Sequence, residues 1–270
     1  MKLGVFISLT NTPEIEFKKV RDFGFPTCQL NGWVQSLFTD EIAKRVVAAG
    51  KQYNVEITSF WCGWEGPAVW DFIDGPLTLG LVPQAFRHER LKMLMRGSDF
   101  AAKIGVQDLV THVGFIPEDP NNPEYKSLIT ALRYLAQYCR NHGQNFLFET
   151  GQETPVTLLR TIEDIGLDNL GINLDPANLI LYGKANPVDA LDVLGKYIKG
   201  VHAKDGLYPT SGRYLGQEVP LGQGKVNFPA FITRLKEVGF DGPLTIEREI
   251  SGDEQTADIR TAKALLEKLI

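Results

Sequence analysis

The chain has 270 residues and an ordinary globular composition, with 43% hydrophobic and 23% charged residues. Its formal net charge is −5 and it has no basic stripe, which argues against a nucleic-acid-binding protein. The apolar run near the N-terminus covers only Leu3–Ile7, so we expect neither a signal segment nor a membrane-spanning helix. The three cysteines form no close pair, which predicts buried free thiols and a cytoplasmic protein (Cys28, Cys62 and Cys139).

Eight short apolar runs rich in β-branched residues recur along the chain, and each is predicted to form a strand. These runs are Lys2–Ser8, Thr27–Leu30, Val55–Trp61, Asp108–Val113, Asn145–Glu149, Gly171–Asp175, Ile198–Lys204 and Pro243–Glu247. Helical periodicity between them predicts helices at Pro13–Phe23, Thr39–Tyr53, Pro83–Ile104, Glu124–His142, Pro155–Ile165, Pro187–Leu194, Phe228–Val238 and Glu254–Leu269. No linker or low-complexity tract interrupts the alternation, so residues 1–270 are predicted to form a single domain.

Several predicted helices are followed by a glycine shortly before the next strand, as in "DFGFP", "KIGVQ", "NHGQN" and "EVGFD". A glycine in this place suits the left-handed end of a helix, and the short connections that result favour parallel βα units. Eight units in a chain of this length predict an α/β fold, the (β/α)8 TIM barrel, whose usual size is about 250 residues. A doubly wound sheet is the second choice, because it normally has a Gly-rich phosphate loop after its first strand, and "SLTNTPE" contains no glycine.

The active site of a TIM barrel lies at the carboxyl ends of its strands, so the residues that end each strand matter most. Four consecutive predicted strands end in, or carry, residues that can bind a metal: Glu149, Asp175, His202 and Glu247. Asp175 alone, before a proline, also fits a helix N-cap. Three converging carboxylates, however, would repel one another strongly unless a cation neutralised them. The set therefore predicts one divalent metal ion, with Mn²⁺ the first choice, Mg²⁺ and Co²⁺ also suited and Zn²⁺ compatible.

At these residues the chain resembles the sugar phosphate isomerase/epimerase group of the xylose-isomerase-like TIM barrels. The resemblance lies in "FET", "NLDPAN", "VHAKDG" and the stretch from Val219 to Glu249, and it extends over essentially the whole chain. It implies one metal ion held by the four strand-end residues, as in the ketose 3-epimerases of the group. It also implies that Glu149 and Glu247 remove and return a proton on opposite faces of a substrate carbon, through a metal-stabilised enediolate.

Other residues near the strand ends are candidates for substrate binding. Asn178 stands where the 3-epimerases have a histidine, which leaves 3-epimerase specificity open. Lys204 suits a substrate oxygen or a phosphate, and an ion pair with the neighbouring Asp205 is the alternative. His112 is either a substrate contact or a hydrogen-bonded structural histidine. Arg213, in the loop before the last strand, is a candidate for a sugar hydroxyl or phosphate, with a surface position as the alternative.

Aromatic side chains form the other half of a sugar site, because their faces pack on the C–H faces of sugars. Trp33, Trp61 and Trp64 lie at or just beyond the ends of the second and third predicted strands. Core packing explains Trp61 equally well, whereas Trp64 is predicted to lie in a glycine-flanked loop. Glu249, two residues after Glu247, is predicted to be a rim residue or an ion-pair partner.

The predicted activity is metal-dependent isomerisation or epimerisation of a sugar or sugar phosphate. The alternative is a lyase or dehydratase acting on a keto-sugar or inosose, which shares the first proton abstraction and then expels a leaving group. A phosphodiesterase of the AP endonuclease kind would need a zinc cluster and many histidines, and the chain has four histidines. A catalytically silent sugar-binding barrel would have no need of the complete ligand set. We expect a small carbohydrate as the partner and no nucleic acid or membrane, and the sequence leaves assembly into a homo-oligomer open.

Overall fold

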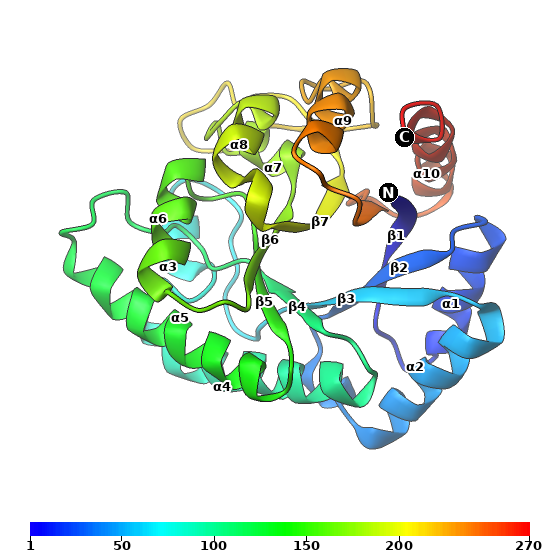
Figure 1. Ribbon diagram of the computed structural model, residues 1–270, viewed down its shortest axis with the longest axis horizontal. Helices are drawn as coiled ribbons and strands as arrows, with labels where there is room; N and C mark the ends of the chain where they lie inside the picture. The colour runs from blue at the N-terminus through cyan, green and yellow to red at the C-terminus, as the bar shows by residue number, and fades with distance from the viewer.

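The computed structural model describes all 270 residues, and its centre is a closed barrel of parallel strands (Figure 1). Around the barrel the strands follow the order β1-β10-β7-β6-β5-β4-β3-β2, and a two-stranded ladder, β8–β9, lies outside it. The barrel strands are β1 (Lys2–Ser8), β2 (Thr27–Gly32), β3 (Glu56–Cys62), β4 (Asp108–Thr111), β5 (Asn145–Glu149), β6 (Leu170–Leu174), β7 (Ile198–Ala203) and β10 (Pro243–Ile246). The predicted TIM barrel is therefore confirmed.

Helices connect successive strands and form a ring around the barrel (Figure 1). They are α1 (Pro13–Asp22), α2 (Asp40–Tyr53), α3 (Gly75–Thr78), α4 (Gln84–Lys103), α5 (Pro123–Asn141), α6 (Pro155–Ile165), α7 (Pro176–Leu181), α8 (Pro187–Leu194), α9 (Phe228–Glu237) and α10 (Asp253–Leu266). The ring closes where Lys263 of α10 donates a hydrogen bond to the carbonyl oxygen of Phe23, after α1, at 2.8 Å. None of these helices combines the length and the apolar character that crossing a bilayer requires.

The predicted helix ends are confirmed at the glycines. Gly24, Gly105, Gly143 and Gly239 follow α1, α4, α5 and α9, and their φ angles are 74°, 75°, 68° and 80°. A residue with a Cβ adopts these left-handed angles only at a cost in free energy. Each glycine thus ends its helix sharply and lets the chain turn directly into the next strand.

Two short helices and the β8–β9 ladder escaped prediction, and four barrel strands, β4, β6, β7 and β10, end one or two residues earlier than predicted. Helix α7 has six residues and α3 has four, which is too few for a helical period to be visible in the sequence. Strand β6 ends at Leu174, because Asp175 leaves the strand and caps α7. Its Oδ1 accepts a hydrogen bond from the backbone N–H of Asn178 at 3.0 Å, so the N-cap alternative for Asp175 is correct.

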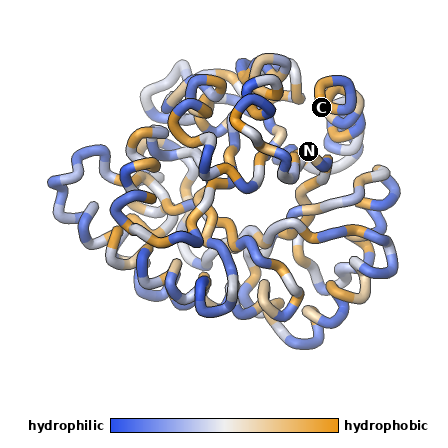
Figure 2. The backbone as a smooth tube through the Cα atoms, viewed as in Figure 1, coloured by the Kyte–Doolittle hydropathy of each residue, from blue (hydrophilic) through white to orange (hydrophobic).

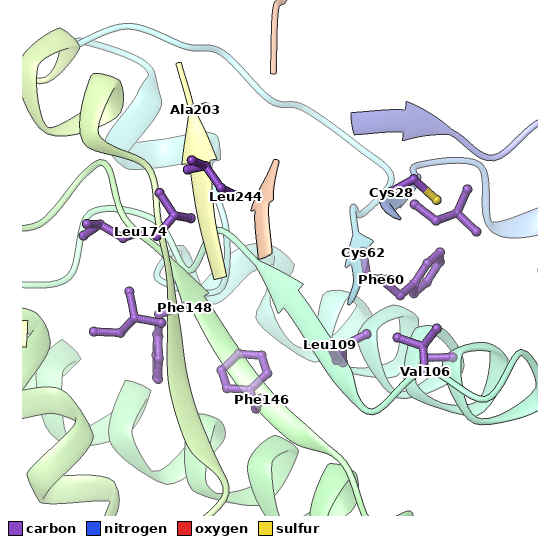
Figure 3. Packing of buried hydrophobic residues seen from close by; sticks show 14 of the residues in the cluster. Cys28, Phe60, Cys62, Val106, Leu109, Phe146, Phe148, Leu174, Ala203 and Leu244 are labelled. Carbon is purple, nitrogen blue, oxygen red and sulfur yellow. The ribbon is translucent and has the colours of Figure 1, made fainter. Parts of the chain in front are cut away.

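The apolar core lies between the barrel and the helix ring. Along β5, Phe146 and Phe148 point outward and their rings meet edge to face at 5.1 Å, as Figure 3 shows among other core side chains. Leu147 and Glu149 alternate with them and face the barrel interior. In Figure 2 hydrophilic and hydrophobic residues alternate along the helices of the ring, as expected for helices with one buried face. The alternation along β5 therefore turns Glu149 into the barrel while the two phenylalanines pack in the outer core.

The ladder of β8 (Asp205–Gly206) and β9 (Glu218–Val219) belongs to a loop organised by one carboxylate. Asp205 is buried, and its Oδ1 accepts hydrogen bonds from the backbone N–H groups of Gly206 and Val226 at 2.9 and 3.1 Å. Its Oδ2 accepts from Gly222 and Gly224, both at 3.0 Å. A Cβ on Gly224 would lie 2.0 Å from Oδ1 of Asp205, so only glycine fits there. The "LGQG" sequence therefore wraps a carboxylate of the protein itself.

We expect Asp205→Ala to lower the free energy of unfolding by about 3 kcal/mol, because four backbone donors lose a charged acceptor. Chemical denaturation would measure the change. Asp22→Ala is the matched control, since Asp22 is exposed and makes only a surface ion pair with Lys18. Equal stability of the two variants would contradict this role of Asp205.

Candidate metal centre and active site

Four side chains converge at the carboxyl ends of neighbouring barrel strands. Glu149 ends β5, Asp175 follows β6, His202 lies in β7 and Glu247 follows β10. Each offers one ligand atom, and these atoms all lie within 4.8 Å of one another. All four residues are buried, and Asp175 and His202 are completely so. The structure thus brings together the four residues that the sequence predicts as metal ligands.

One imidazole nitrogen faces all three carboxylates. His202 Nδ1 lies 3.0 Å from Glu247 Oε2, 3.3 Å from Glu149 Oε1 and 3.6 Å from Asp175 Oδ2. Atoms that share a metal ion at 2.0–2.2 Å lie roughly 3 to 4.4 Å apart, so these spacings suit a common ion.

Two buried polar atoms in this cluster have no hydrogen-bond partner. They are Asp175 Oδ2 and His202 Nδ1. An orphaned atom of this kind normally costs a folded protein free energy, and a bound cation removes that cost. The two oxygens of Asp175 make different contacts. Oδ1 caps α7, and Oδ2 points toward the cluster. The donor set and its orphaned atoms therefore fit a divalent metal ion.

The charges of the cluster shift its pKa values strongly. Burial alone would raise the pKa of Glu149, but the His112 and His202 rings hold it well below its usual range. Burial likewise opposes the shift at Glu247, where Lys204 and His202 lower the pKa to about 2. Burial would lower the pKa of His202, yet Glu247 and Glu149 raise it well above its usual value. As long as no metal is bound, these shifts favour the protonated form of His202 and the ionised forms of both glutamates.

Three further side chains contact Glu149. The indole N–H of Trp61 donates a hydrogen bond to Oε2. Asn178 Nδ2 and His112 Nε2 both lie 3.4 Å from Oε1. His112 Nδ1 is buried and has no partner within the chain. Trp61, His112 and Asn178, each predicted at the site, thus meet at one candidate ligand.

Lys204 is buried beside the cluster, among acidic side chains. Its Nζ lies 3.1 Å from Glu249 Oε1, 3.3 Å from Glu247 Oε2 and 3.5 Å from Asp175 Oδ2. The alternative pairing of Lys204 with Asp205 is wrong, because Asp205 is occupied by the backbone of its loop. Glu249 is an ion-pair partner of Lys204, as the sequence predicts.

Arg248 fixes the chain between the two glutamates. Its guanidinium lies 3.0 Å from Glu218, in β9, and 2.8 Å from Asp258, in α10. The backbone N–H of Glu249 also donates to the Glu218 carboxylate, at 3.1 Å. The end of β10 is thus tied both to the β8–β9 loop and to the last helix.

A cavity of about 530 Å³ opens above the cluster. Of the four candidate ligands, only Glu149 and Glu247 line it, because Asp175 and His202 lie deeper. His112, Asn178, Trp33 and Trp61 line it as well. Arg213 is exposed in the loop after β8 and does not line the cavity.

The prediction that favoured Trp64 over Trp61 as a cavity wall is not what the structure shows. Trp64 is buried, and its ring centroid lies 5.4 Å from that of Trp33 and 5.2 Å from the Arg90 guanidinium. It supports Trp33 from behind, whereas Trp61 lines the cavity. The glycine-flanked loop packs inward, because a Cβ on Gly63 would lie only 2.4 Å from the Trp33 ring.

Several residues of the site escaped the sequence analysis. Gln29, in β2, accepts a hydrogen bond from His202 Nε2 at 2.5 Å. Trp70 and Tyr182 line the cavity. Glu153 lies just beyond β5, and burial raises its pKa to about 7. Gln29 had a visible signal, since Thr27, Gln29 and Asn31 alternate along one face of an otherwise apolar strand. Trp70 lies in an irregular loop and had none.

A sequence profile of the xylose isomerase-like TIM barrel family matches residues 17–269, nearly the whole chain. The chain belongs to this family. A crystal structure of a xylose isomerase domain protein from Planctomyces limnophilus superposes with a TM-score of 0.94 at 38% identity, covering 99% of this chain and 96% of that one. A D-tagatose 3-epimerase-like protein has the same fold, with a TM-score of 0.76 at 24% identity and coverage of 100% and 97%.

Curated relatives match over shorter stretches. The uncharacterized protein MJ1311 of Methanocaldococcus jannaschii is 29% identical over 160 residues, which is 55% of this chain and 53% of the relative. The matched region thus spans about half the length of the curated relatives, or slightly less. These relatives are uncharacterized, so the likeness to them assigns no activity to this chain.

We expect metal binding to release a proton. The raised pKa of His202 means that, below this pKa, a proton must leave Nδ1 before a metal can bind, while the ionised glutamates release none. The observed affinity for Mn²⁺ should therefore rise by about tenfold per pH unit and keep rising above the ordinary histidine pKa of about 6.5. Calorimetry in buffers of different ionisation enthalpy counts the protons. An affinity independent of pH between 6.5 and 8 would contradict this charge distribution.

Proposed function

We propose that the protein is a metal-dependent sugar isomerase or epimerase that removes the proton next to a carbonyl group. One observation carries this proposal: of four converging ligand residues, the two glutamates line the cavity while the aspartate and histidine lie beneath it. Family membership and the likeness to a D-tagatose 3-epimerase-like protein support it.

Glu149 and Glu247 are the proposed acid/base pair. They stand at the ends of β5 and β10, which are separated in the barrel by β6 and β7, so they approach the cavity from different sides. Each carboxylate is ionised, because neighbouring cations lower its pKa. One removes the α-proton and the other delivers a proton to the opposite face, which gives epimerisation. Return of the proton to the adjacent carbon by one base gives aldose–ketose isomerisation.

The proposed metal ion is held by Glu149, Asp175, His202 and Glu247, with Mn²⁺ as the first choice for this oxygen-rich set. When bound, it supplies positive charge for the negative charge that develops on the substrate oxygens. His112, Asn178 and Lys204 are proposed to bind substrate hydroxyl or carbonyl oxygens around it. Trp33 and Trp61 are proposed to pack on the sugar, while the exposed Arg213 and the buried Trp64 are less suited to contact it.

A lyase or dehydratase is the second candidate, and Lys204 is the observation that favours it. Its ammonium lies 3.3 Å from Glu247, so it could stabilise a leaving oxygen after the same proton abstraction. Asn178, in place of the histidine of the 3-epimerases, leaves room for such a substrate. Elimination differs from epimerisation in its product, which makes the two easy to separate. Cytoplasmic location remains a prediction from the sequence, and assembly into a homo-oligomer stays open.

The test incubates the Mn²⁺-loaded protein in D₂O with ketoses, keto-sugars and inososes and follows the α-proton by NMR. We expect exchange of that proton without an unsaturated product, and an unsaturated product would select the lyase. Glu149→Gln and Glu247→Gln should each slow the exchange by about 10²- to 10⁴-fold. Glu237→Gln, on the exposed end of α9, is the matched control and should exchange like the wild type.

Metal content is measured for each variant, so that a lost base is distinguished from a lost ion. A metal-free Glu247→Gln variant with wild-type exchange would contradict the mechanism. Absence of exchange with every sugar in the metal-loaded protein would overturn the proposed function itself.

A further inference from the structure

We infer that the site selects uncharged sugars and rejects phosphate esters, an inference that rests on the proposed function and narrows it to a substrate class. Apart from the proposed metal ligands Glu149 and Glu247, the cavity walls carry one carboxylate, that of Glu249, and one full cation, Arg248. A terminal phosphate is a dianion, so it needs at least one free cationic partner to replace its hydration.

The two buried or partly buried cations near the cavity, Arg248 and Lys204, are already paired. Arg248 lies between Glu218 and Asp258 at 3.0 and 2.8 Å. Lys204 is in contact with Glu249 at 3.1 Å and with Glu247 at 3.3 Å. A phosphate could recruit either one only by displacing a carboxylate from a buried or partly buried pair.

The charge of the phosphate group, and not the size of a sugar phosphate, is what excludes these esters. A cavity of about 530 Å³ lies well within the range of sites that hold ligands larger than a single sugar ring. A sugar phosphate would therefore fit sterically. The rim is where its phosphate would lie, and there the exposed carboxylate of Glu249 meets it with a like charge.

The experiment compares D-fructose with D-fructose 6-phosphate, and D-ribulose with D-ribulose 5-phosphate, in the D₂O exchange assay. For each active pair we expect kcat/KM for the uncharged sugar to exceed that of the ester by about tenfold or more. Glu249→Gln should shrink this ratio, because it removes the carboxylate nearest the rim. If either ester exchanged faster than its uncharged sugar, the inference would be overturned and the proposed function would stand. If no sugar exchanged, in these pairs or in the wider panel, the proposed function itself would be overturned.

Arg213 supplies the control, because it is the exposed cation in the loop beside the mouth. If it turned inward to bind phosphate, Arg213→Met would raise the preference for the uncharged sugar. We expect the ratio to stay unchanged. A ratio that responds to Arg213→Met but not to Glu249→Gln would overturn the inference.

A separate observation, the polar interior of the barrel below the ligands, supports a second inference. We propose that Gln29 is a positioning residue that makes Nδ1 of His202 the metal-binding atom. The Gln29 amide nitrogen donates to Ser59 Oγ at 2.6 Å and lies 3.3 Å from Asn173 Oδ1, which directs Oε1 toward His202 Nε2, 2.5 Å away. An oxygen acceptor there requires a proton on Nε2, so the Nδ1 lone pair is left for the metal.

The contact is rigid because every partner is buried inside the barrel. Gln29, Ser59 and Asn173 come from β2, β3 and β6, and none is more than 5% exposed. The ring of Phe6 packs edge-on against His202 with centroids 5.5 Å apart. The hydrogen bond crosses the barrel from β2 to β7, which are not neighbours in the strand order. The imidazole can therefore neither turn over nor slide without breaking the interior network.

The test measures Mn²⁺ affinity and the tautomer of His202. We expect Gln29→Met, which keeps the size and removes the acceptor, to weaken Mn²⁺ binding by about 10- to 100-fold. Gln29→Glu retains an acceptor and should restore most of the affinity. Thr245→Val, a buried polar-to-apolar substitution in β10 that removes no hydrogen bond of Gln29, is the control and should bind like the wild type.

The wild-type protein provides a readout that needs no variant to fold. In the Zn²⁺-loaded protein with ¹⁵N-labelled histidine, the His202 ring should show a proton on Nε2 and the metal on Nδ1. Metal on Nε2, or an unchanged affinity in Gln29→Met, would overturn this role of Gln29.

Discussion

The rest of this structure depends on three carboxylates that converge in a buried space. Glu149, Asp175 and Glu247 would repel one another if they were left alone, and the basic side chains placed against them are His112, His202 and Lys204. When His202 gives up its proton to become a ligand, its positive charge is lost, and the charge of Lys204 is shared with Glu249. A divalent ion then offsets more of the remaining negative charge than a monovalent ion does. The charge of the proposed metal thus follows from the residues around it.

The scaffold around this cluster is organised to keep its polar groups in place. TIM barrels usually fill their interior with branched apolar side chains. Here the layer below the ligands contains Gln29, Ser59 and Asn173, whose mutual hydrogen bonds offset the cost of burying them. Outside the barrel, Asp205 collects four backbone donors and orders the loop before α9. In both arrangements hydrogen bonds fix the orientation of the groups they join, and apolar packing would fix that orientation less strictly.

The sequence predicts the barrel and the four ligands because both follow from local rules. Strand periodicity, glycines after helices and the rule that active sites lie at carboxyl ends of strands are all visible within short windows. Contacts across the barrel have no such signal. The bond between Gln29 and His202 joins residues 173 positions apart, and the partner of Lys204 depends on whether Asp205 turns toward its own loop. The prediction that favoured Trp64 over Trp61 as a cavity wall was wrong for a similar reason. The glycine-flanked loop that carries Trp64 packs inward against Trp33.

Three successive residues at the end of β10 each make a different kind of contact. Side chains alternate as the strand leaves the barrel, so Glu247 and Glu249 face the interior and Arg248 faces the helices. Glu247 reaches the metal cluster, Arg248 joins the strand end to Glu218 and Asp258, and Glu249 meets Lys204 at the cavity wall. Because Arg248 holds the backbone, a change at Glu249 alters the charge of the rim without moving Glu247. A substitution at Glu249 can therefore change the charge of the cavity wall while the four candidate ligands stay in place.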